Sequence, residues 1–600
     1  MAEITDSPAF ATSPGVTTEN HVLLRDNGSH WLYFRDPVEI LVVHSQAAVR
    51  STLGKIARAV ESQGLYAAGY LAYEAAPAFD SALQVRSPSP LPLLWFGLYP
   101  APETLALPGS GNPAAYELGD WLPSITLDEY RQAFASVKDY IARGETYQVN
   151  YSYRLRAGFV GSAWDYFLHL AHAQQAKYSA FLDLGDYAIC SASPELFFRQ
   201  MGSQLTSLPM KGTAPRGRTL SEDEDLKDWL CHSEKNRAEN LMIVDMIRND
   251  LGRIAAIGSV SVSNLFDVER YPTVLQMTST VEAETQVSFP EIMAALFPCA
   301  SITGAPKVRT MQIIAELEST PRGVYTGCIG FLAPGRQAQF NVAIRTVTID
   351  RQHNLAEYGV GGGIVWDSEC DDEFQECQLK ARVLTETPPT FYLLETLLWE
   401  TETGYFLLQE HLNRLTASAK YFQYTVDIDA ICKELQRIST TMAGGSFKIR
   451  LLSSQDGTFR LEASCIKGIP AEPIRLALAA NPVDAQSPYL FHKTTFRQIY
   501  EDARKGHPDA DDVLLWNIHG QLTETTIANV VLRIAGELLT PQLSCGLLGG
   551  TFRAHLLACG VIKEAVIPVE ALLQAEEIFL INAVRKWRHA RLLCPVKPEL

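Results

Sequence analysis

Residues 300–318 read ASITGAPKVRTMQIIAELE, and this stretch combines a helix with a special start. Ser301, Thr303 and Gly304 come just before a proline, and helix-forming residues follow it. Hydroxyls and free backbone amides at the start of a helix bind carboxylates or phosphates well. The stretch therefore indicates an anion site, although a structural turn explains such a motif equally well when it stands alone.

The whole chain has the size and composition of a multidomain globular protein. Its 600 residues exceed what a single core supports, so two or more domains are expected. A hydrophobic fraction of 47% and a charged fraction of 20% are ordinary for such proteins. The net charge of −17 argues against nucleic acid or an anionic membrane as a partner. No apolar run is long enough to cross a membrane.

The cysteines and the N-terminus indicate a cytoplasmic protein. The eleven cysteines are scattered, with no C-x-x-C pair and no zinc spacing, which fits reduced thiols. The first residues lack the basic and apolar regions of a signal peptide. They are rich in Ser, Thr, Pro and Ala, so we expect a disordered tail over residues 1–20.

The clearest domain boundary lies near residues 384–391, where Pro388 and Pro389 stop a charged helical segment. This predicts one domain over residues 21–385 and another over residues 391–600. Both mix helical and strand-like runs, so we expect an α+β or α/β multidomain protein. In the first domain, Ser221 and Glu224 form an S-x-x-E pattern that predicts the start of a helix at Ser221.

Several other features of the first domain carry possible chemistry. Residues 209–217, PMKGTAPRG, predict a turn that contains Lys211. Residues 361–363 are three consecutive glycines, which allow the backbone to approach a ligand closely. Arg345 could fork onto a carboxylate. Each feature also has an ordinary explanation, as a solvated loop, a turn or a surface ion pair.

Acidic residues suggest a metal. Glu239 lies within a predicted helix beside Asn240. Glu373 and Glu376 are three residues apart and share one helix face, with Lys380 one turn further on. Carboxylates completed by substrate and water suit Mg²⁺. Spacing alone favours the alternative, a solvated face with a Glu–Lys pair.

Five motifs in order make the first domain resemble the chorismate-utilising enzymes, which include anthranilate, aminodeoxychorismate, isochorismate and salicylate synthases. The resemblance spans roughly residues 120–385. The motifs are PMKGTAPRG, AENLMIVDMIRNDLGRI (238–254), ASITGAPKVRTMQIIAELE, FNVAIRT (340–346) and YGVGGGIVWDSECDDEFQE (358–376).

The resemblance implies a fold of two packed α/β subdomains and a set of site residues. Glu239 and Glu376 would bind Mg²⁺, and Glu195 would be the general acid that protonates a departing hydroxyl. Substrate would be bound by Tyr325, Arg345, Gly212, Thr213, Thr303, Gly361, Gly362 and Gly363. Gln276 departs from the family, which often has histidine there, so a ring contact from that position is in doubt.

The resemblance also gives Lys211 a meaning. Anthranilate synthases have alanine at this position, whereas lysine resembles aminodeoxychorismate synthase or the isochorismate and salicylate synthases. In the first of these the lysine is thought to add to ring carbon 2 before ammonia adds at carbon 4, and in the isochorismate synthases it would activate water. An amine in a closed pocket near a metal can be held neutral for such a role. Lys211 therefore argues against anthranilate synthesis and leaves the other two reactions open.

The second domain contains a different set of motifs. Lys493 ends an apolar, strand-like stretch ahead of a helix, and Glu524 precedes another strand-like run. Arg414 lies in an amphipathic helix, and Gly550 and Thr551 open a further helix. A lysine, a carboxylate, an arginine and a glycine-rich helix start together make a plausible site for a phosphorylated cofactor.

Together these motifs resemble the fold-type IV pyridoxal-phosphate enzymes over about residues 391–590. The resemblance implies that Lys493 bonds to the cofactor aldehyde and later moves a proton. Glu524 would pair with the pyridinium nitrogen. The phosphate would be bound by Arg414, Thr525, Thr526, Gly550 and Thr551. Such a domain is either a transaminase or a lyase, and it could form a homodimer, although the sequence does not give the oligomeric state.

The combination favours a bifunctional enzyme of folate biosynthesis. Amination of chorismate at carbon 4 gives aminodeoxychorismate, whose amine a pyridoxal-phosphate lyase can use to release pyruvate and 4-aminobenzoate. The alternative is an isochorismate or salicylate synthase fused to a class IV aminotransferase. None of the cysteines lies in a glutaminase-type G-x-C-x-G motif, so ammonia is expected from a separate glutamine amidotransferase subunit.

Overall fold

The computed structural model describes residues 19–593 except 27–29, 88–89, 107–108, 110, 387–388, 443, 467 and 469–471. Most of the expected N-terminal tail, residues 1–18, thus lies outside the described residues. The chain forms two compact units, the first of residues 1–215 and 227–388 and the second of residues 216–226 and 389–600. Among the described residues, no helix has the length and apolar character needed to span a membrane.

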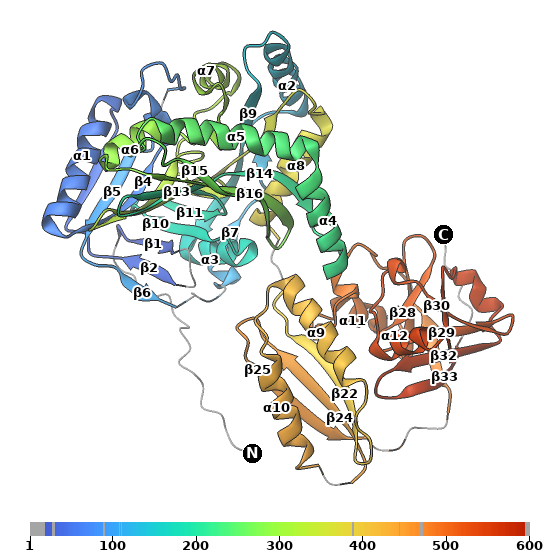
Figure 1. The fold of residues 1–600 in the computed structure, drawn as a ribbon. Helices are drawn as coiled ribbons and strands as arrows, with labels where there is room; N and C mark the ends of the chain where they lie inside the picture. Colours follow the sequence, from blue (N-terminus) through green and yellow to red (C-terminus); the bar gives the residue numbers. More distant parts are fainter. Residues whose placement is uncertain are drawn as a thin grey trace. The chain divides into compact units, whose positions relative to one another are not determined.

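Unit 1 is built on two large, mainly antiparallel sheets (Figure 1). The strand order of the first sheet is β17 (Gly304–Ala305), β9 (Gln148–Gly161), β21 (Leu355–Ile364), β20 (Thr346–Asp350), β11 (Tyr187–Ser193), β10 (Tyr178–Asp183), β1 (Val22–Arg25), β2 (Trp31–Phe34) and β6 (Glu103–Leu105), with β7 (Tyr116–Leu118) and β8 (Leu122–Pro123) paired to β9. The order of the second is β14 (Met210–Pro215), β16 (Val274–Glu284), β13 (Gln204–Leu208), β12 (Leu196–Met201), β19 (Gln337–Val342), β18 (Cys328–Ala333), β4 (Tyr66–Leu71), β5 (Leu94–Tyr99) and β3 (Glu39–Val43), with β15 (Ser261–Arg270) paired to β16.

The two sheets pack face to face, and helices cover their outer faces. Strand β1 shows why, because its residues alternate: Val22 and Leu24 join a core cluster with Tyr70 and Trp95 of the other sheet, whereas Leu23 joins the cluster under the helices. The described helices of this unit are α1 (Gln46–Gln63), α2 (Leu127–Ala142), α3 (Ala163–Gln174), α5 (Glu234–Gly252), α6 (Phe289–Leu296), α7 (Lys307–Leu317) and α8 (Cys370–Ala381). The predicted fold of two packed α/β subdomains is confirmed.

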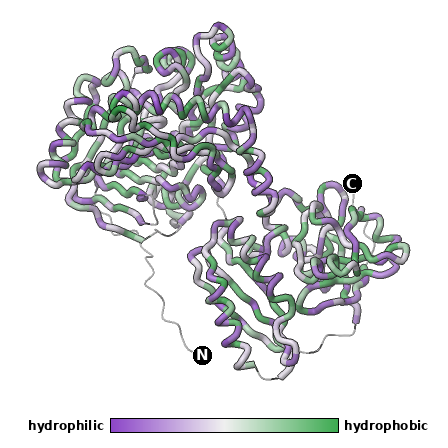
Figure 2. The backbone as a smooth tube through the Cα atoms, viewed as in Figure 1, coloured by the Kyte–Doolittle hydropathy of each residue, from purple (hydrophilic) through white to green (hydrophobic). Residues whose placement is uncertain are grey.

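Unit 2 contains a four-stranded and an eight-stranded sheet. The smaller, β23 (Gly404–Tyr405), β22 (Leu393–Glu400), β24 (Ser446–Ser453) and β25 (Phe459–Cys465), packs with α9 (Leu408–Phe422) and α10 (Ile428–Ser439). The larger has the order β28 (Leu522–Thr525), β27 (Asp512–Trp516), β26 (Ile474–Leu478), β33 (Lys586–Leu592), β32 (Glu577–Asn582), β29 (Asn529–Ile534), β30 (Glu537–Pro541) and β31 (Lys563–Ala565). Its helices are α11 (Gln498–Lys505) and α12 (Thr551–Ala558). In Figure 2 the strands of both units carry much of the hydrophobic colour, as a buried sheet requires.

A short segment from the middle of the sequence belongs to unit 2. Arg216 forms an ion pair of 2.7 Å with the buried Asp223, and its guanidinium lies 4.4 Å from the centre of the Tyr421 ring. The Tyr421 hydroxyl donates a 2.7 Å hydrogen bond to the Gly217 carbonyl. Residues 216–226 are therefore an integral part of the second core and not an external loop.

The helix predicted to begin at Ser221 begins one residue earlier. Helix α4 spans Leu220–His232, and the hydroxyl that accepts a backbone hydrogen bond at its start is that of Thr219, 3.2 Å from the Glu222 amide. Ser221 lies inside the helix because Thr219 already caps it. The segment around Glu239 forms a separate helix, α5, capped by the Ser233 side chain.

Candidate functional site

Lys211 lies in a bulged strand and not in the predicted turn. Strand β14 pairs with β16 on both sides of the lysine, and the register shifts between Met210 and Thr213. Gly212 absorbs the extra residue with a φ of +95°, a conformation that costs glycine little. The prolines and glycines correctly indicated an irregular backbone, which is the bulge. Pairing with β16 on both sides of the bulge nevertheless keeps the segment in the sheet.

The consecutive glycines of β21 make room for the Lys211 amine. A Cβ atom placed on Gly363 would collide with Lys211 Nζ and with the Gln148 amide nitrogen. A Cβ on Gly362 would come within 2.8 Å of Glu373 Oε2. The glycines thus bring the backbone of one sheet against the reactive groups, as expected for a close approach.

Glu195 lies in the same part of unit 1 and is only 3% exposed. Burial raises the pKa of its carboxyl to about 7, and the hydrogen bond from Ser301 and the charge of Lys211 oppose that rise. Ser301 Oγ donates to Glu195 Oε1 over 2.6 Å. A carboxyl with this pKa holds its proton part of the time near neutral pH, which suits a general acid.

Two further carboxylates face Lys211 from helix α8. Glu376 forms a 2.8 Å ion pair with Lys380, and mainly for that reason its pKa is lowered. Burial raises the pKa of Glu373, against the opposing effect of a 2.7 Å hydrogen bond from Ser368. The charge of Lys211 acts on both carboxylates. Lys380 also donates to the Gly361 carbonyl over 3.0 Å, so the predicted Glu–Lys pair is bound to the glycine strand β21.

Glu239 is half-exposed on α5 and is less tightly tied to the site. Lys235, one helical turn before it, lowers the pKa of Glu376, which indicates that this face of α5 lies toward α8. Among the described residues the Glu239 carboxylate makes no hydrogen bond or ion pair, and no three His, Cys, Asp or Glu side chains gather closely enough to bind a metal. Two carboxylates could still bind Mg²⁺, which usually keeps several waters and substrate oxygens.

An arginine and a tyrosine form the next part of the site. Arg345 follows β19 with a φ of +49°, and its buried Nη1 atom has no hydrogen-bond partner among the described residues. Tyr325 is buried against Gly359, where a Cβ atom would collide with its ring. A buried guanidinium nitrogen without a partner is costly unless a ligand satisfies it, so Arg345 fits a carboxylate.

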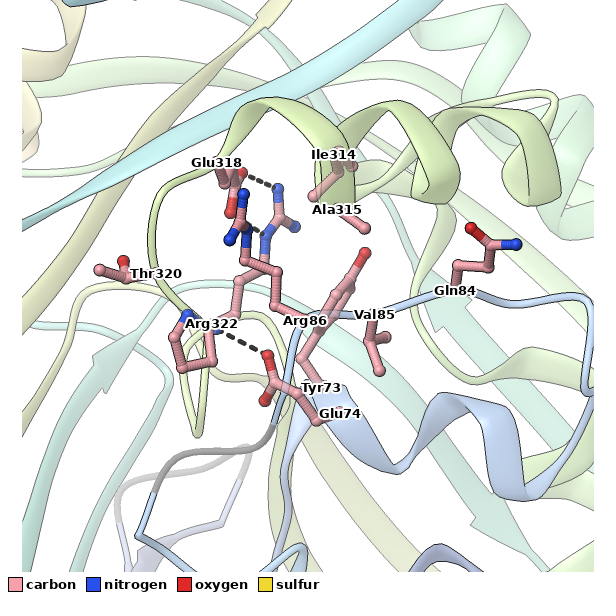
Figure 3. A pocket seen from close by; sticks show the side chains of 11 residues that line it. Tyr73, Glu74, Gln84, Val85, Arg86, Ile314, Ala315, Glu318, Thr320 and Arg322 are labelled. Carbon is pink, nitrogen blue, oxygen red and sulfur yellow. Dashed lines mark hydrogen bonds and ion pairs between the residues drawn. The ribbon is translucent and has the colours of Figure 1, made fainter.

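The loop that carries Tyr325 is fixed by a buried ion pair. Arg322 Nη2 lies 2.6 Å from Glu318, and its guanidinium also lies over the Tyr73 ring (Figure 3). These residues line a small pocket. Glu74, at its edge, accepts hydrogen bonds from the Arg322 and Gly323 backbone amides. This network holds the Tyr325 loop in place.

The other predicted substrate residues have defined positions. The Thr303 hydroxyl is fully buried and donates to the Cys299 and Ala300 carbonyls of the short 3₁₀ helix Ala300–Ile302, and its contact with substrate stays a prediction. The Thr213 hydroxyl donates to Gln276, and the Gln276 amide donates to the Gly212 carbonyl. Gln276, at the position where the family often has histidine, therefore links β16 to the strand that carries Lys211 through two side-chain hydrogen bonds.

Gln148 is a site residue that the sequence did not reveal. It is fully buried in β9, and neither of its amide atoms has a hydrogen-bond partner among the described residues. Its amide nitrogen and Lys211 Nζ both lie next to Gly363. A glutamine between two apolar strand residues gives no signal of its own, because only the pairing of β9 with β21 brings it to the lysine.

The second site surrounds Lys493. Burial lowers the pKa of its amine to about 8, assisted by the charge of Arg414 and opposed by those of Glu395 and Glu524. The stretch before it was predicted as a strand but forms a 3₁₀ helix, Pro488–Leu490, because Pro488 occupies its first position. The Lys493 carbonyl accepts a 2.9 Å hydrogen bond from Leu394, which ties it to β22.

Glu524 lies in strand β28 and accepts three hydrogen bonds. Tyr500 donates to Oε1 over 2.8 Å, the Leu548 amide over 3.1 Å, and the Asn529 side chain to Oε2 over 3.3 Å. Burial nevertheless raises the pKa of Glu524 to about 7. A buried carboxylate with this support can pair with a protonated ring nitrogen.

Arg414 occupies the opposite part of this site. Its guanidinium binds Glu395 with two nitrogens, at 2.9 and 2.7 Å, and donates to the Gly549 carbonyl at 3.1 Å, next to the start of α12. The Thr551 hydroxyl lies 3.2 Å from His411. A Cβ on Gly550 would collide with the Asn529 side chain. The Arg414 guanidinium and the N-terminus of α12 are groups of the kind that bind a phosphate.

The two remaining threonines form the turn after β28. The Thr526 hydroxyl donates to the buried Asp512, and the Thr525 hydroxyl donates 3.0 Å to the Ala528 carbonyl. Both hydroxyls are thus used within the turn, which leaves their phosphate contact a prediction. Taken together, Lys493, Glu524 and Arg414 fit a phosphorylated pyridine aldehyde.

Comparison with known proteins agrees with this geometry. The family model for chorismate binding enzymes matches residues 18–386, and that for class IV aminotransferases matches residues 392–593, which implies pyridoxal phosphate as a cofactor. Aminodeoxychorismate synthase component 1 of Escherichia coli is 43% identical over 259 residues, which are 43% of this chain and 57% of that protein. The Bacillus subtilis protein of the same name is 40% identical over 265 residues, 44% of this chain and 56% of that protein.

These matches cover little more than half the length of the curated relatives. Among solved structures, anthranilate synthase component I of Streptococcus pneumoniae superposes with a TM-score of 0.53 at 24% identity, over 64% of this chain and 95% of that one, and supports the fold. The chain belongs to the chorismate binding enzyme family and continues, after that domain, into a class IV aminotransferase fold.

Proposed function

We propose that the protein converts chorismate and ammonia into 4-aminobenzoate and pyruvate, in two steps at two sites. The observation that carries the proposal is the pair of lysines. Lys211 lies near the carboxylates of Glu195, Glu373 and Glu376. Lys493 lies beside Glu524 and Arg414. The similarity to enzymes named aminodeoxychorismate synthase component 1 supports the first step.

In the first step, Arg345 and Tyr325 would bind the enolpyruvyl carboxylate of chorismate. Glu239 and Glu376 would hold Mg²⁺, which neutralises the ring carboxylate. Lys211 would bond to ring carbon 2 while the carbon 4 hydroxyl leaves with the proton of Glu195. Ammonia would then bond to carbon 4, and the Lys211 nitrogen would leave carbon 2. The raised pKa of Glu195 supports its role as the acid, since the carboxyl must carry a proton when the hydroxyl departs.

In the second step, pyridoxal phosphate would supply the electron sink for the new amine. Glu524 would hold the ring nitrogen in its protonated form, and Arg414 with the start of α12 would bind the phosphate. Lys493 would remove the proton from ring carbon 4 as the bond between carbon 3 and oxygen breaks and pyruvate leaves. An amine whose pKa is near 8 can take up and return a proton near neutral pH.

The two steps are chemically linked. The lyase step needs an amine on the ring, and amination at carbon 4 provides one. Isochorismate, the product of the rival synthase, has no amine for the second site to use.

The supply of ammonia and the cellular setting are also part of the proposal. We place the glutaminase on a separate subunit, in agreement with relatives named as a first component. The cysteines of the described residues are free thiols, which supports a cytoplasmic enzyme. A homodimer through the second unit remains a prediction.

The test is product analysis of the purified protein. Chorismate, an ammonium salt and pyridoxal phosphate should yield 4-aminobenzoate and pyruvate in equal amounts when Mg²⁺ is present, and chelation of Mg²⁺ should stop both. An isochorismate or salicylate synthase would form its product without ammonium. Turnover independent of ammonium would therefore refute the proposal.

A further inference from the structure

At the bulge in β14, Lys211 and Gly212 have no partner residues in the register with β16, and two side-chain amides bind their carbonyls. Asn240 Nδ2 donates to the Lys211 carbonyl over 3.2 Å, and Gln276 Nε2 donates to the Gly212 carbonyl over 2.9 Å. A buried carbonyl without a partner would cost stability, so these amides determine where the bulge sits. These two side chains, together with the pairing to β16, therefore fix the backbone position of Lys211.

The Asn240 amide is itself fixed in one orientation. Asn240 is fully buried, and its Oδ1 accepts a 2.6 Å hydrogen bond from Ser279 Oγ. Ser279 Oγ in turn accepts a 3.2 Å bond from the Phe266 amide, so its proton is available for Asn240. The nitrogen of the Asn240 amide must then point at Lys211.

Asn240 also connects the two parts of the first site. It follows Glu239 in helix α5, which packs against β14 and β16. We infer that Asn240 is a positioning residue for amination, which holds the Lys211 backbone at a fixed distance from the helix that carries Glu239. This role rests on the proposed attack by Lys211, for which the amine must approach ring carbon 2 closely.

An isosteric change separates this role from simple packing. Asn240→Asp keeps the size of the side chain and the acceptor for Ser279, but it replaces the donor to Lys211 with a carboxylate oxygen. Two oxygens facing each other repel, so the Lys211 carbonyl should turn away and carry the amine with it. A displacement of about 1 Å can reduce turnover on the order of 100-fold.

The experiment measures amination by Asn240→Asp beside the matched control Asn249→Asp, which adds the same charge at an exposed position of the same helix. We expect kcat to fall on the order of 100-fold for Asn240→Asp. The KM for chorismate and the Mg²⁺ concentration for half activity should stay near those of the parent and the control. A shift in the Mg²⁺ requirement instead of kcat would show that Asn240 acts through Glu239, and would overturn the inference, as would an unchanged kcat.

A second readout does not depend on activity. Acetic anhydride labels lysines, and peptide mass spectrometry gives the labelling rate of Lys211 relative to the exposed Lys177. The relative rate should change in Asn240→Asp and not in Asn249→Asp; equal rates would refute the positioning role. If the parent protein makes no aminated product, the proposed function fails, and labelling alone then decides whether Asn240 places Lys211.

Ser279→Ala covers the case in which Asn240→Asp does not fold. It leaves the Asn240 donor in place but frees the amide to rotate. The same changes in kcat and in Lys211 labelling are expected, in the same direction and smaller. Parent-like values for both would overturn the inference.

Discussion

The two lysines of the proposed sites lie in different electrostatic surroundings: carboxylates act on Lys211, whereas both arginines and carboxylates act on Lys493. The charged neighbours on which Lys211 acts are the carboxylates of Glu195, Glu373 and Glu376. Lys493 has Arg414 among its neighbours, and burial together with that charge lowers the pKa of its amine to about 8. The first environment places an amine beside a group that can release a proton to a leaving hydroxyl. The second prepares the amine itself to gain and lose a proton.

The buried glutamates show the same contrast. Burial raises the pKa of both Glu195 and Glu524 to about 7. Glu195 accepts hydrogen bonds from the Ser301 side chain and the Met210 backbone, whereas Glu524 accepts three, from two side chains and one backbone amide. Hydrogen bonds to the ionised form lower the pKa of a carboxyl, and in both sites burial outweighs them. The same pKa thus serves an acid in one site and a counter-ion in the other.

The largest expected effect comes from Lys211→Ala. Because every later step depends on amination, 4-aminobenzoate and pyruvate should both fall by at least about 1,000-fold, as when a nucleophile is removed. Lys177→Ala, which removes an exposed lysine of the same unit, should keep parent activity. Continued formation of 4-aminobenzoate by Lys211→Ala would show that the lysine is not the nucleophile. A product aminated at carbon 2 would instead sharpen the comparison with anthranilate synthases.

Glu195→Gln should reduce amination about 100- to 10,000-fold, the usual contribution of a general acid. In the parent protein the rate should fall as pH rises through about 7, because the carboxyl loses the proton that it must donate. Ser301→Ala should move this fall to higher pH, since the lost hydrogen bond favours the ionised form. A pH profile of amination that is flat between 6 and about 8, or one that rises there, would contradict the assignment.

Tyr500→Phe tests the support of Glu524 and should have a smaller effect. Loss of one donor to a buried carboxylate should slow release of pyruvate about tenfold and leave amination unchanged. The pH dependence of the visible absorption of bound pyridoxal phosphate should also change. Tyr405→Phe removes a hydroxyl that bonds to the Leu435 carbonyl in the same unit and serves as the control. Equal absorption spectra in the two variants would remove Tyr500 from the site.

The smallest effect concerns the segment that joins unit 2 from the middle of the chain. Thr219→Ala should lower the free energy of unfolding by about 1 kcal/mol, because Thr219 caps helix α4. Ser221→Ala should be nearly neutral, since Ser221 lies inside the helix. Denaturant unfolding of the full chain measures both. If Ser221→Ala were more destabilising than Thr219→Ala, the helix would start at Ser221, as the sequence alone predicted.

The sequence was sufficient for both folds and for most of the residues around the two lysines, because motifs with fixed chemistry occur there in a fixed order. It was not sufficient where a partner far along the chain decides the outcome. Lys211 appeared to lie in a turn because its neighbours are Pro and Gly, yet β16, more than sixty residues later, keeps it in a sheet. Gln148 gave no signal, since its place next to Gly363 and Lys211 depends on the pairing of β9 with β21.

Residue pairs within one helix were predicted only in part. The spacing of Glu376 and Lys380 indicated their ion pair, but not that Lys380 also binds the Gly361 carbonyl of the glycine strand. The capping pattern at Ser221 was equally regular and proved wrong, because Thr219 was an alternative cap of equal quality. Local patterns therefore identify which residues interact, and tertiary contacts decide which of them belong to a site.

The most direct test of two consecutive reactions on one chain uses Lys493→Ala with chorismate and ¹⁵N-labelled ammonium. Mass spectrometry should detect a chorismate derivative in which a ¹⁵N amino group replaces the hydroxyl, and no 4-aminobenzoate, whereas Lys505→Ala, at an exposed position of α11, should form labelled 4-aminobenzoate like the parent. Undiminished 4-aminobenzoate from Lys493→Ala, or a product without nitrogen, would contradict the account.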